Sequence, residues 1–85
     1  MSSIVQSVMF NFNRWSVIKA AQWLQDHDFK VKKLDITENY LRFRQVSPTS
    51  LKKKGFTQYI TKRIKNDIEL IIALKPNQEI KSNLR

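Results

Sequence analysis

Apolar and polar residues alternate along much of the chain with the two-residue period of a β-strand. The alternation predicts a first strand over residues 4–12, in which the apolar positions share one side and Gln6 interrupts them. It is most regular over residues 68–74, where the intervening positions are largely apolar as well. Because a strand that is apolar on both sides is usually covered on both faces, we expect residues 68–74 to lie centrally in a sheet.

Three further strands are predicted between these two, over residues 31–37, 40–46 and 56–64. Residues 47–55 contain a proline, three consecutive lysines and the only glycine of the chain, a composition typical of a loop. Residues 65–67, with the sequence Lys-Asn-Asp, suit a tight hairpin turn. The second half of the chain is therefore predicted to be a series of strands joined by short connections.

The segment after the first strand has the spacing of a helix instead. Ser16 is a favourable N-cap, because its hydroxyl can accept a hydrogen bond from a free amide of the first turn. Trp15 and Ala20 occupy the two positions of a hydrophobic staple, and apolar residues continue at helical spacing to Leu24. Residues 26–28, Asp-His-Asp, are expected to end this helix.

The predicted order of elements is β-α-β-β-β-β, which indicates an α+β fold. We expect a small two-layer domain in which one helix packs on a mostly antiparallel sheet, leaving the other face of the sheet for solvent or a partner. Residues 1–76 form the single basic domain of this prediction, and residues 77–85 form a polar C-terminal tail.

The composition excludes several classes of protein to which the chain could otherwise belong. The chain has 85 residues, no cysteine and a single histidine, so a disulfide framework and sulfur-ligated metal sites are excluded. No apolar run approaches the ~18 residues of a membrane-spanning helix, so no membrane span is predicted. We expect no signal peptide, and hence an intracellular location.

A formal net charge of +9 is the feature that bears most on partners. Residues 1–29 carry equal numbers of acids and bases, so the whole excess lies in residues 30–85. The natural partners of such a surface are nucleic acid, an anionic membrane surface or an acidic protein. A solvated basic surface without a dedicated ligand is the alternative.

The alternation over residues 40–46 predicts a candidate nucleic-acid site. It places Tyr40, Arg42 and Arg44 on one face of a strand, where an aromatic ring can stack on a base and guanidinium groups can hold phosphates. In the alternative interpretation this is an ordinary exposed row whose arginines pair across strands with acids, namely Asp35, Glu38 or Glu69.

Two further groups of cations extend the candidate site. Lys52, Lys53 and Lys54 lie in the predicted loop, where flexible ammonium groups can follow a phosphate backbone, although a solvated loop explains them equally well. Lys62 and Arg63 lie on the next predicted strand. If that strand neighbours the one that carries Arg42, all these groups form one continuous positive stripe.

No catalytic signature emerges from the sequence. One glycine cannot form a phosphate-binding loop, and the only imidazole, His27, stands between two acids that point in divergent directions from a helix end. The expectation is therefore a protein that is not an enzyme and that has no metal site and no cofactor.

The chain resembles small uncharacterised domains encoded by bacteriophages and large DNA viruses. The resemblance rests on residues 5–8, on the pattern W-S-x-x-K-A-x-x-W-L-x-x-H over residues 15–27, and on K-x-D-x-T-x-N-Y-x-R-F-R-Q over residues 33–45. It extends over residues 4–75, but residues 65–67 replace the glycine-bearing hairpin of those domains. The resemblance implies a viral or mobile-element origin, and a location in the host cytoplasm or the virion.

Two functions fit these features. The first is a small, non-enzymatic module that binds DNA or RNA. The alternative is a structural or interaction protein, such as a minor virion component or an anti-defence inhibitor, that binds an acidic protein surface. Such a protein could accept an added strand at a sheet edge or self-associate into a homo-oligomer.

Overall fold

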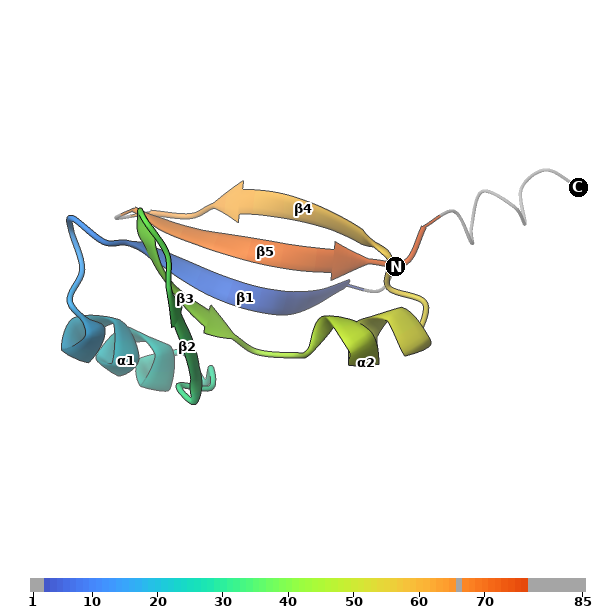
Figure 1. Cartoon of the computed structure of the whole chain (residues 1–85), viewed down its shortest axis with the longest axis horizontal. Coiled ribbons are helices and arrows are strands. Elements are labelled where there is room, and N and C mark those ends of the chain that lie inside the picture. The colour runs from blue at the N-terminus through green and yellow to red at the C-terminus, as the bar shows by residue number, and fades with distance from the viewer. Residues whose placement is uncertain (1–2, 66, 77–85) are drawn as a thin grey trace, which may run out of the picture.

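The computed structural model describes residues 3–65 and 67–76 and contains one five-stranded sheet with two short helices (Figure 1). The helices are α1 (Val17–Asp26) and α2 (Pro48–Lys53). The strands are β1 (Ser3–Asn11), β2 (Lys33–Ile36), β3 (Tyr40–Arg44), β4 (Gln58–Arg63) and β5 (Ile68–Leu74). Their order across the sheet is β2-β3-β1-β5-β4, and every neighbouring pair is antiparallel. The predicted α+β class and the order β-α-β-β-β-β are confirmed.

Helix α1 begins and ends as its sequence requires. The Ser16 hydroxyl accepts a hydrogen bond from the Lys19 amide at 3.2 Å, which confirms the predicted N-cap. At the other end Asp28 has a φ of +63°, and the Phe29 amide donates to the Leu24 carbonyl at 2.8 Å. This left-handed residue closes the helix and returns Phe29 to the core.

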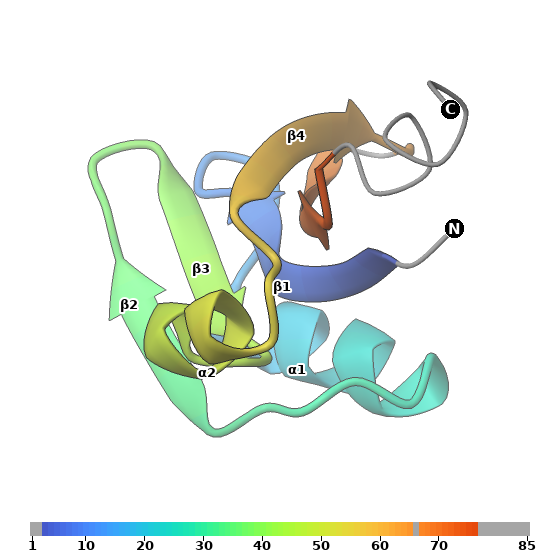
Figure 2. The same ribbon diagram turned by 90° about the vertical axis from the view of Figure 1, so that its right-hand side faces the viewer.

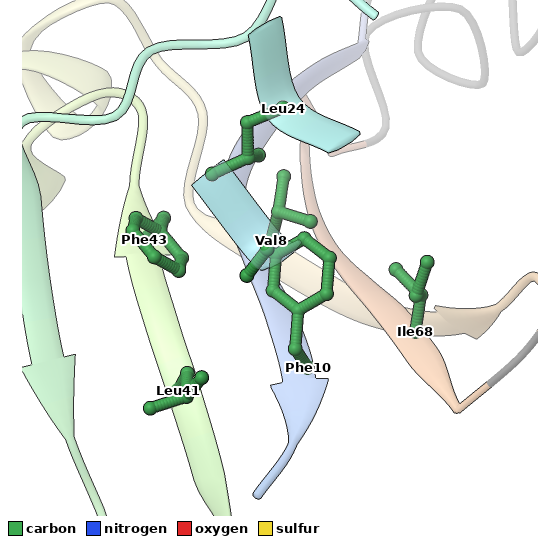
Figure 3. Packing of buried hydrophobic residues seen from close by; sticks show 7 residues of the cluster. Val8, Phe10, Leu24, Leu41, Phe43 and Ile68 are labelled. Atoms are coloured by element: carbon green, nitrogen blue, oxygen red, sulfur yellow. The ribbon is translucent and has the colours of Figure 1, made fainter. Parts of the chain in front are cut away.

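The core lies between α1 and one face of the sheet (Figure 3). Phe10 stands at its centre, with its ring 5.0 Å from that of Trp15 and 5.7 Å from that of Phe43. Edge-on and tilted aromatic contacts of this kind add stability to the burial of the rings. The fully buried members of this cluster are Val8, Phe10, Ala20, Leu24, Leu41, Phe43 and Ile68.

The predicted loop over residues 47–55 is wrong in part, because it contains helix α2. The Ser47 hydroxyl accepts from the Ser50 amide at 3.1 Å, and Pro48 follows at a position where a helix tolerates proline. Leu51 and Phe56 pack against Ala73, which alternates with the residues that face α1. Helix α2 therefore covers one end of the sheet face opposite α1.

The strands also differ from prediction in their extents. β2 and β4 are shorter than the predicted 31–37 and 56–64, and β3 stops at Arg44. Strand β5 has a neighbour on each side, but the middle strand is β1. Residue 66 of the predicted turn and the whole predicted tail, residues 77–85, lie outside the described residues.

Strand β1 has a bulge at Gln6, which explains why this polar residue interrupts the apolar pattern. The register between β1 and β5 shifts between Val5 and Ser7, so that Gln6 has no opposite residue on β5. Before the bulge, Ser3 pairs with Leu74, and the start of β1 thus lies beside the end of β5 (Figure 1).

Candidate nucleic-acid interface

Strand β3 carries the row of side chains that the sequence singled out. Tyr40, Arg42 and Arg44 alternate with buried Leu41 and Phe43, so the row lies on the face of the sheet opposite α1. All three are half-buried. The predicted placement on one face is confirmed, but the three side chains have different surroundings.

Arg42 is held by buried neutral groups. Its Nε donates to the Ser7 hydroxyl at 3.2 Å, and its Nη2 donates to Gln6 Oε1 at 3.1 Å. The Ser7 hydroxyl donates to the same Gln6 oxygen at 2.6 Å, and Gln6 Nε2 donates to the Val46 carbonyl at 3.0 Å. This network joins Arg42 to the bulge of β1. Gln6 and Ser7 are 2% and 0% exposed, so the groups that accept from Arg42 lie away from water.

Tyr40 and Arg44 instead contact acidic side chains of other strands, Glu69 on β5 beyond β1 and Asp35 on the neighbouring β2. The Tyr40 hydroxyl donates to Glu69 Oε2 at 3.4 Å, and Arg44 Nη2 lies 3.7 Å from Asp35 Oδ2. The alternative of cross-strand ion pairs is thus confirmed for Arg44. Because the two side chains are 38% and 58% exposed and water screens the pair, it contributes only about 0–1 kcal/mol, so Arg44 can exchange Asp35 for another anion.

The other predicted cations do not form one stripe with this row. β1 and β5 separate β3 from β4, so the two strands are not neighbours. Arg63 shares the face of Arg42 but forms an ion pair with Glu69 at 3.1 Å. Lys62 pairs with Leu70 and lies on the face of α1. Three exposed lysines, Lys52, Lys53 and Lys54, lie in the last turn and C-cap of α2.

A pocket at the β2 side of the sheet brings the predicted Arg44 together with three lysines that the sequence pattern did not single out. It has a volume of about 310 Å³, and we call it the basic pocket. Lys33 on β2 and Arg44 on β3 are directly opposite in the register, so both belong to the same face. The residues that line the pocket are Lys30, Lys32, Lys33, Arg44, Gln45, Val46 and Ser47.

Gln45 attaches one wall of this pocket to the end of β3. Its Oε1 accepts from the Lys30 amide at 2.7 Å, and its Nε2 donates to the Lys30 carbonyl at 2.9 Å. One side chain thereby satisfies both backbone groups of Lys30, as a neighbouring strand would. The segment that enters β2 is therefore held beside β3, and this fixes the backbone positions from which the side chains of Lys30 and Lys32 extend.

The basic pocket carries a large excess of positive charge. Asp35 is paired with Arg44, while within residues 3–65 and 67–76 no carboxylate lies within ion-pair distance of Lys30, Lys32 or Lys33. The lysines are exposed, so their ammonium groups can move toward a ligand. A site of this kind suits an anion with several oxygen atoms, such as a phosphate group.

The structure also describes the surroundings of His27 and bears on metal sites and membrane-spanning helices. The His27 ring stacks on Trp23 at 3.8 Å between centroids, and its Nδ1 lies 2.8 Å from the Trp23 carbonyl. Among the described side chains, no group of three His, Cys, Asp or Glu could hold a metal ion. Of the helices in the described part of the chain, none is long and apolar enough to cross a bilayer.

Comparison with known proteins adds no relative. No family model, curated protein or solved structure matches the chain. The resemblance to domains of bacteriophages and large DNA viruses therefore stays a prediction, and function is inferred from the geometry of the charged surface.

Proposed function

We propose that this protein is a small, non-enzymatic module that binds nucleic acid through backbone phosphates. The observation that carries the proposal is the basic pocket, which is lined by four cations, of which only Arg44 forms an ion pair with a described carboxylate, that of Asp35. The phosphate groups carry the negative charge of a nucleic acid, and their neutralisation supplies essentially all of the affinity in binding that is not sequence-specific.

Each cation of the proposed site has its own part. Arg44 presents a planar guanidinium, which can hold two phosphate oxygens when it leaves Asp35. Lys30, Lys32 and Lys33 act as mobile point charges around it. The lysines of α2 lengthen the contact, because Ser47 both lines the pocket and caps that helix. Arg42 supports the sheet beneath the site through Gln6 and Ser7.

The test removes three positive charges from the pocket and compares the affinity for nucleic acid with that of a variant that loses three positive charges elsewhere. The pocket variant is Lys30→Gln, Lys33→Gln and Arg44→Gln. The control is Lys19→Gln, Lys62→Gln and Lys65→Gln, three exposed lysines that do not line the pocket. Binding is measured by fluorescence anisotropy with labelled single-stranded and duplex DNA and RNA over a series of salt concentrations.

The pocket variant is expected to bind at least about tenfold more weakly, and its plot of log affinity against log salt should be shallower by about two units. The control variant should keep most of its affinity and its slope. Equal losses in the two variants would show that net charge alone attracts the nucleic acid, and this would refute the proposed site.

A further inference from the structure

Strand β4 forms one edge of the sheet, and half of its backbone hydrogen-bonding groups face outward. The Ile64 amide donates to the Ile68 carbonyl at 2.9 Å, so residues 64 and 68 form a hydrogen-bonded pair of the antiparallel ladder. Such pairs alternate along the strands. Ile60 and Lys62 therefore bond to β5, while the N–H and C=O groups of Tyr59, Thr61 and Arg63 point away from it.

The side chains of β4 leave this edge open. All six residues of the strand are exposed, and its register with β5 runs without a bulge or a proline. Tyr59 and Ile60 are 44% and 49% exposed, and an exposed edge strand with apolar side chains is a template for pairing with another chain. The opposite edge of the sheet, β2, has only four residues. β4 is thus the longer template for an added strand.

The charge on β4 specifies the kind of strand that fits. Lys62 and Arg63 end the strand, Lys65 follows, and β4 contains no acidic residue. A second copy of a chain with a net charge of +9 would bring further cations to this edge. An incoming segment with carboxylates opposite Lys62 and Arg63 and apolar residues opposite Tyr59 and Ile60 matches both the charge and the exposed apolar groups.

We propose that the β4 edge binds an acidic, extended segment of a partner protein, which adds a sixth strand to the sheet. The backbone groups of Tyr59, Thr61 and Arg63 supply the hydrogen bonds. Lys62 selects for an acidic side chain, and the exposed Arg63, which also holds Glu69 of β5, selects for a second one. This surface is separate from the basic pocket, because β1 and β5 lie between β4 and β3.

Thr61 offers a variant that blocks an added strand and spares the sheet. Its N–H faces outward, so Thr61→Pro removes no hydrogen bond between β4 and β5. Thr61→Ala loses the same hydroxyl but keeps the N–H and is the matched control. The probe is a labelled peptide, acetyl-Val-Glu-Glu-Thr-Val-Val-amide, and its control peptide has proline in place of threonine.

Wild-type protein and Thr61→Ala should bind the probe with affinities within about twofold of each other, and Thr61→Pro should bind it at least about tenfold more weakly. The proline peptide should not bind. The affinity of Thr61→Pro for oligonucleotides should equal that of the wild type, which separates this proposal from the proposed function. Absence of probe binding, or equal binding by Thr61→Pro, overturns the proposal.

Misfolding of the variant and self-association of the protein would each mimic part of this result and are measured separately. If Thr61→Pro does not fold, as judged by circular dichroism, Lys62→Glu takes its place, and unchanged affinity of this variant for the acidic probe overturns the proposal. Sedimentation gives the mass of the free protein. A dimer that Thr61→Pro dissociates would show that a second copy covers the edge, which also overturns it.

Discussion

Arg42 and Arg44 are two residues apart on one strand face, yet the structure gives them different parts. Arg42 donates to the buried groups of Gln6 and Ser7, whereas Arg44 lies beside the exposed carboxylate of Asp35. A hydrogen bond from a charged donor to a buried acceptor is worth more than an exposed ion pair. We therefore assign Arg42 to the stability of the sheet and Arg44 to ligand binding.

This difference gives a prediction for single substitutions. Arg42→Ala should lower the free energy of unfolding by about 1–3 kcal/mol, because Gln6 and Ser7 lose a partner away from water. Arg44→Ala should change it by less than about 0.5 kcal/mol but weaken binding of nucleic acid. Urea denaturation measures the first quantity. The assignment is wrong if Arg44→Ala is the more destabilising of the two.

At the scale of elements, the segment between α1 and β2 decides whether the basic pocket exists. Asp28 turns the chain out of α1, and the Gln45 side chain then holds the Lys30 backbone against the end of β3. The lysines of the pocket belong partly to this connection and partly to β2. Their positions thus depend on a turn and on one amide side chain.

Gln45→Ala should release this segment. The amide of Lys30 should exchange with solvent faster in NMR measurements, because its acceptor is lost, and affinity for nucleic acid should fall by about three- to tenfold. Gln22→Ala, which removes an exposed glutamine of α1, is the control and should change neither quantity. An unchanged exchange rate of the Lys30 amide in Gln45→Ala would show that the Gln45 side chain does not hold this segment.

The alternation of apolar residues predicted the strands and the face of Tyr40, Arg42 and Arg44, because burial on one side of a sheet imposes that period on the sequence. It could not predict the basic pocket. That site requires the pairing of Lys33 with Arg44, which is a matter of register. Helix α2 was missed because a proline followed by polar residues is equally compatible with a loop and with a first helical turn.

For the whole molecule, the order of the strands separates the two proposed surfaces. Residues of β2 and β3 line the basic pocket. These two strands lie on the opposite side of the sheet from β4, the other edge strand (Figure 2). Three strand spacings of about 4.8 Å place β3 and β4 roughly 14 Å apart, which exceeds the Debye length of about 8 Å at physiological salt. Charge neutralised at one surface is therefore largely screened from the other.

The oligonucleotide and the acidic peptide should accordingly bind to the protein at the same time. At physiological salt, a saturating oligonucleotide should change the affinity for the acidic peptide by no more than about twofold, whereas at low salt the peptide should bind more weakly in its presence. A titration of the peptide with and without the oligonucleotide measures this coupling. Mutual exclusion at physiological salt would mean that both ligands occupy one surface.

The pairing of Ser3 with Leu74 has a consequence for how the sheet is assembled. Strand β1 is the middle strand, and it joins β3 to β5, which comes from the far end of the described chain. The sheet is complete only after this loop of some seventy residues has closed, so folding is limited by a contact distant in sequence. A circular permutant that links these two ends and opens the chain between β2 and β3 would turn β1 and β5 into a hairpin and fold through a local contact.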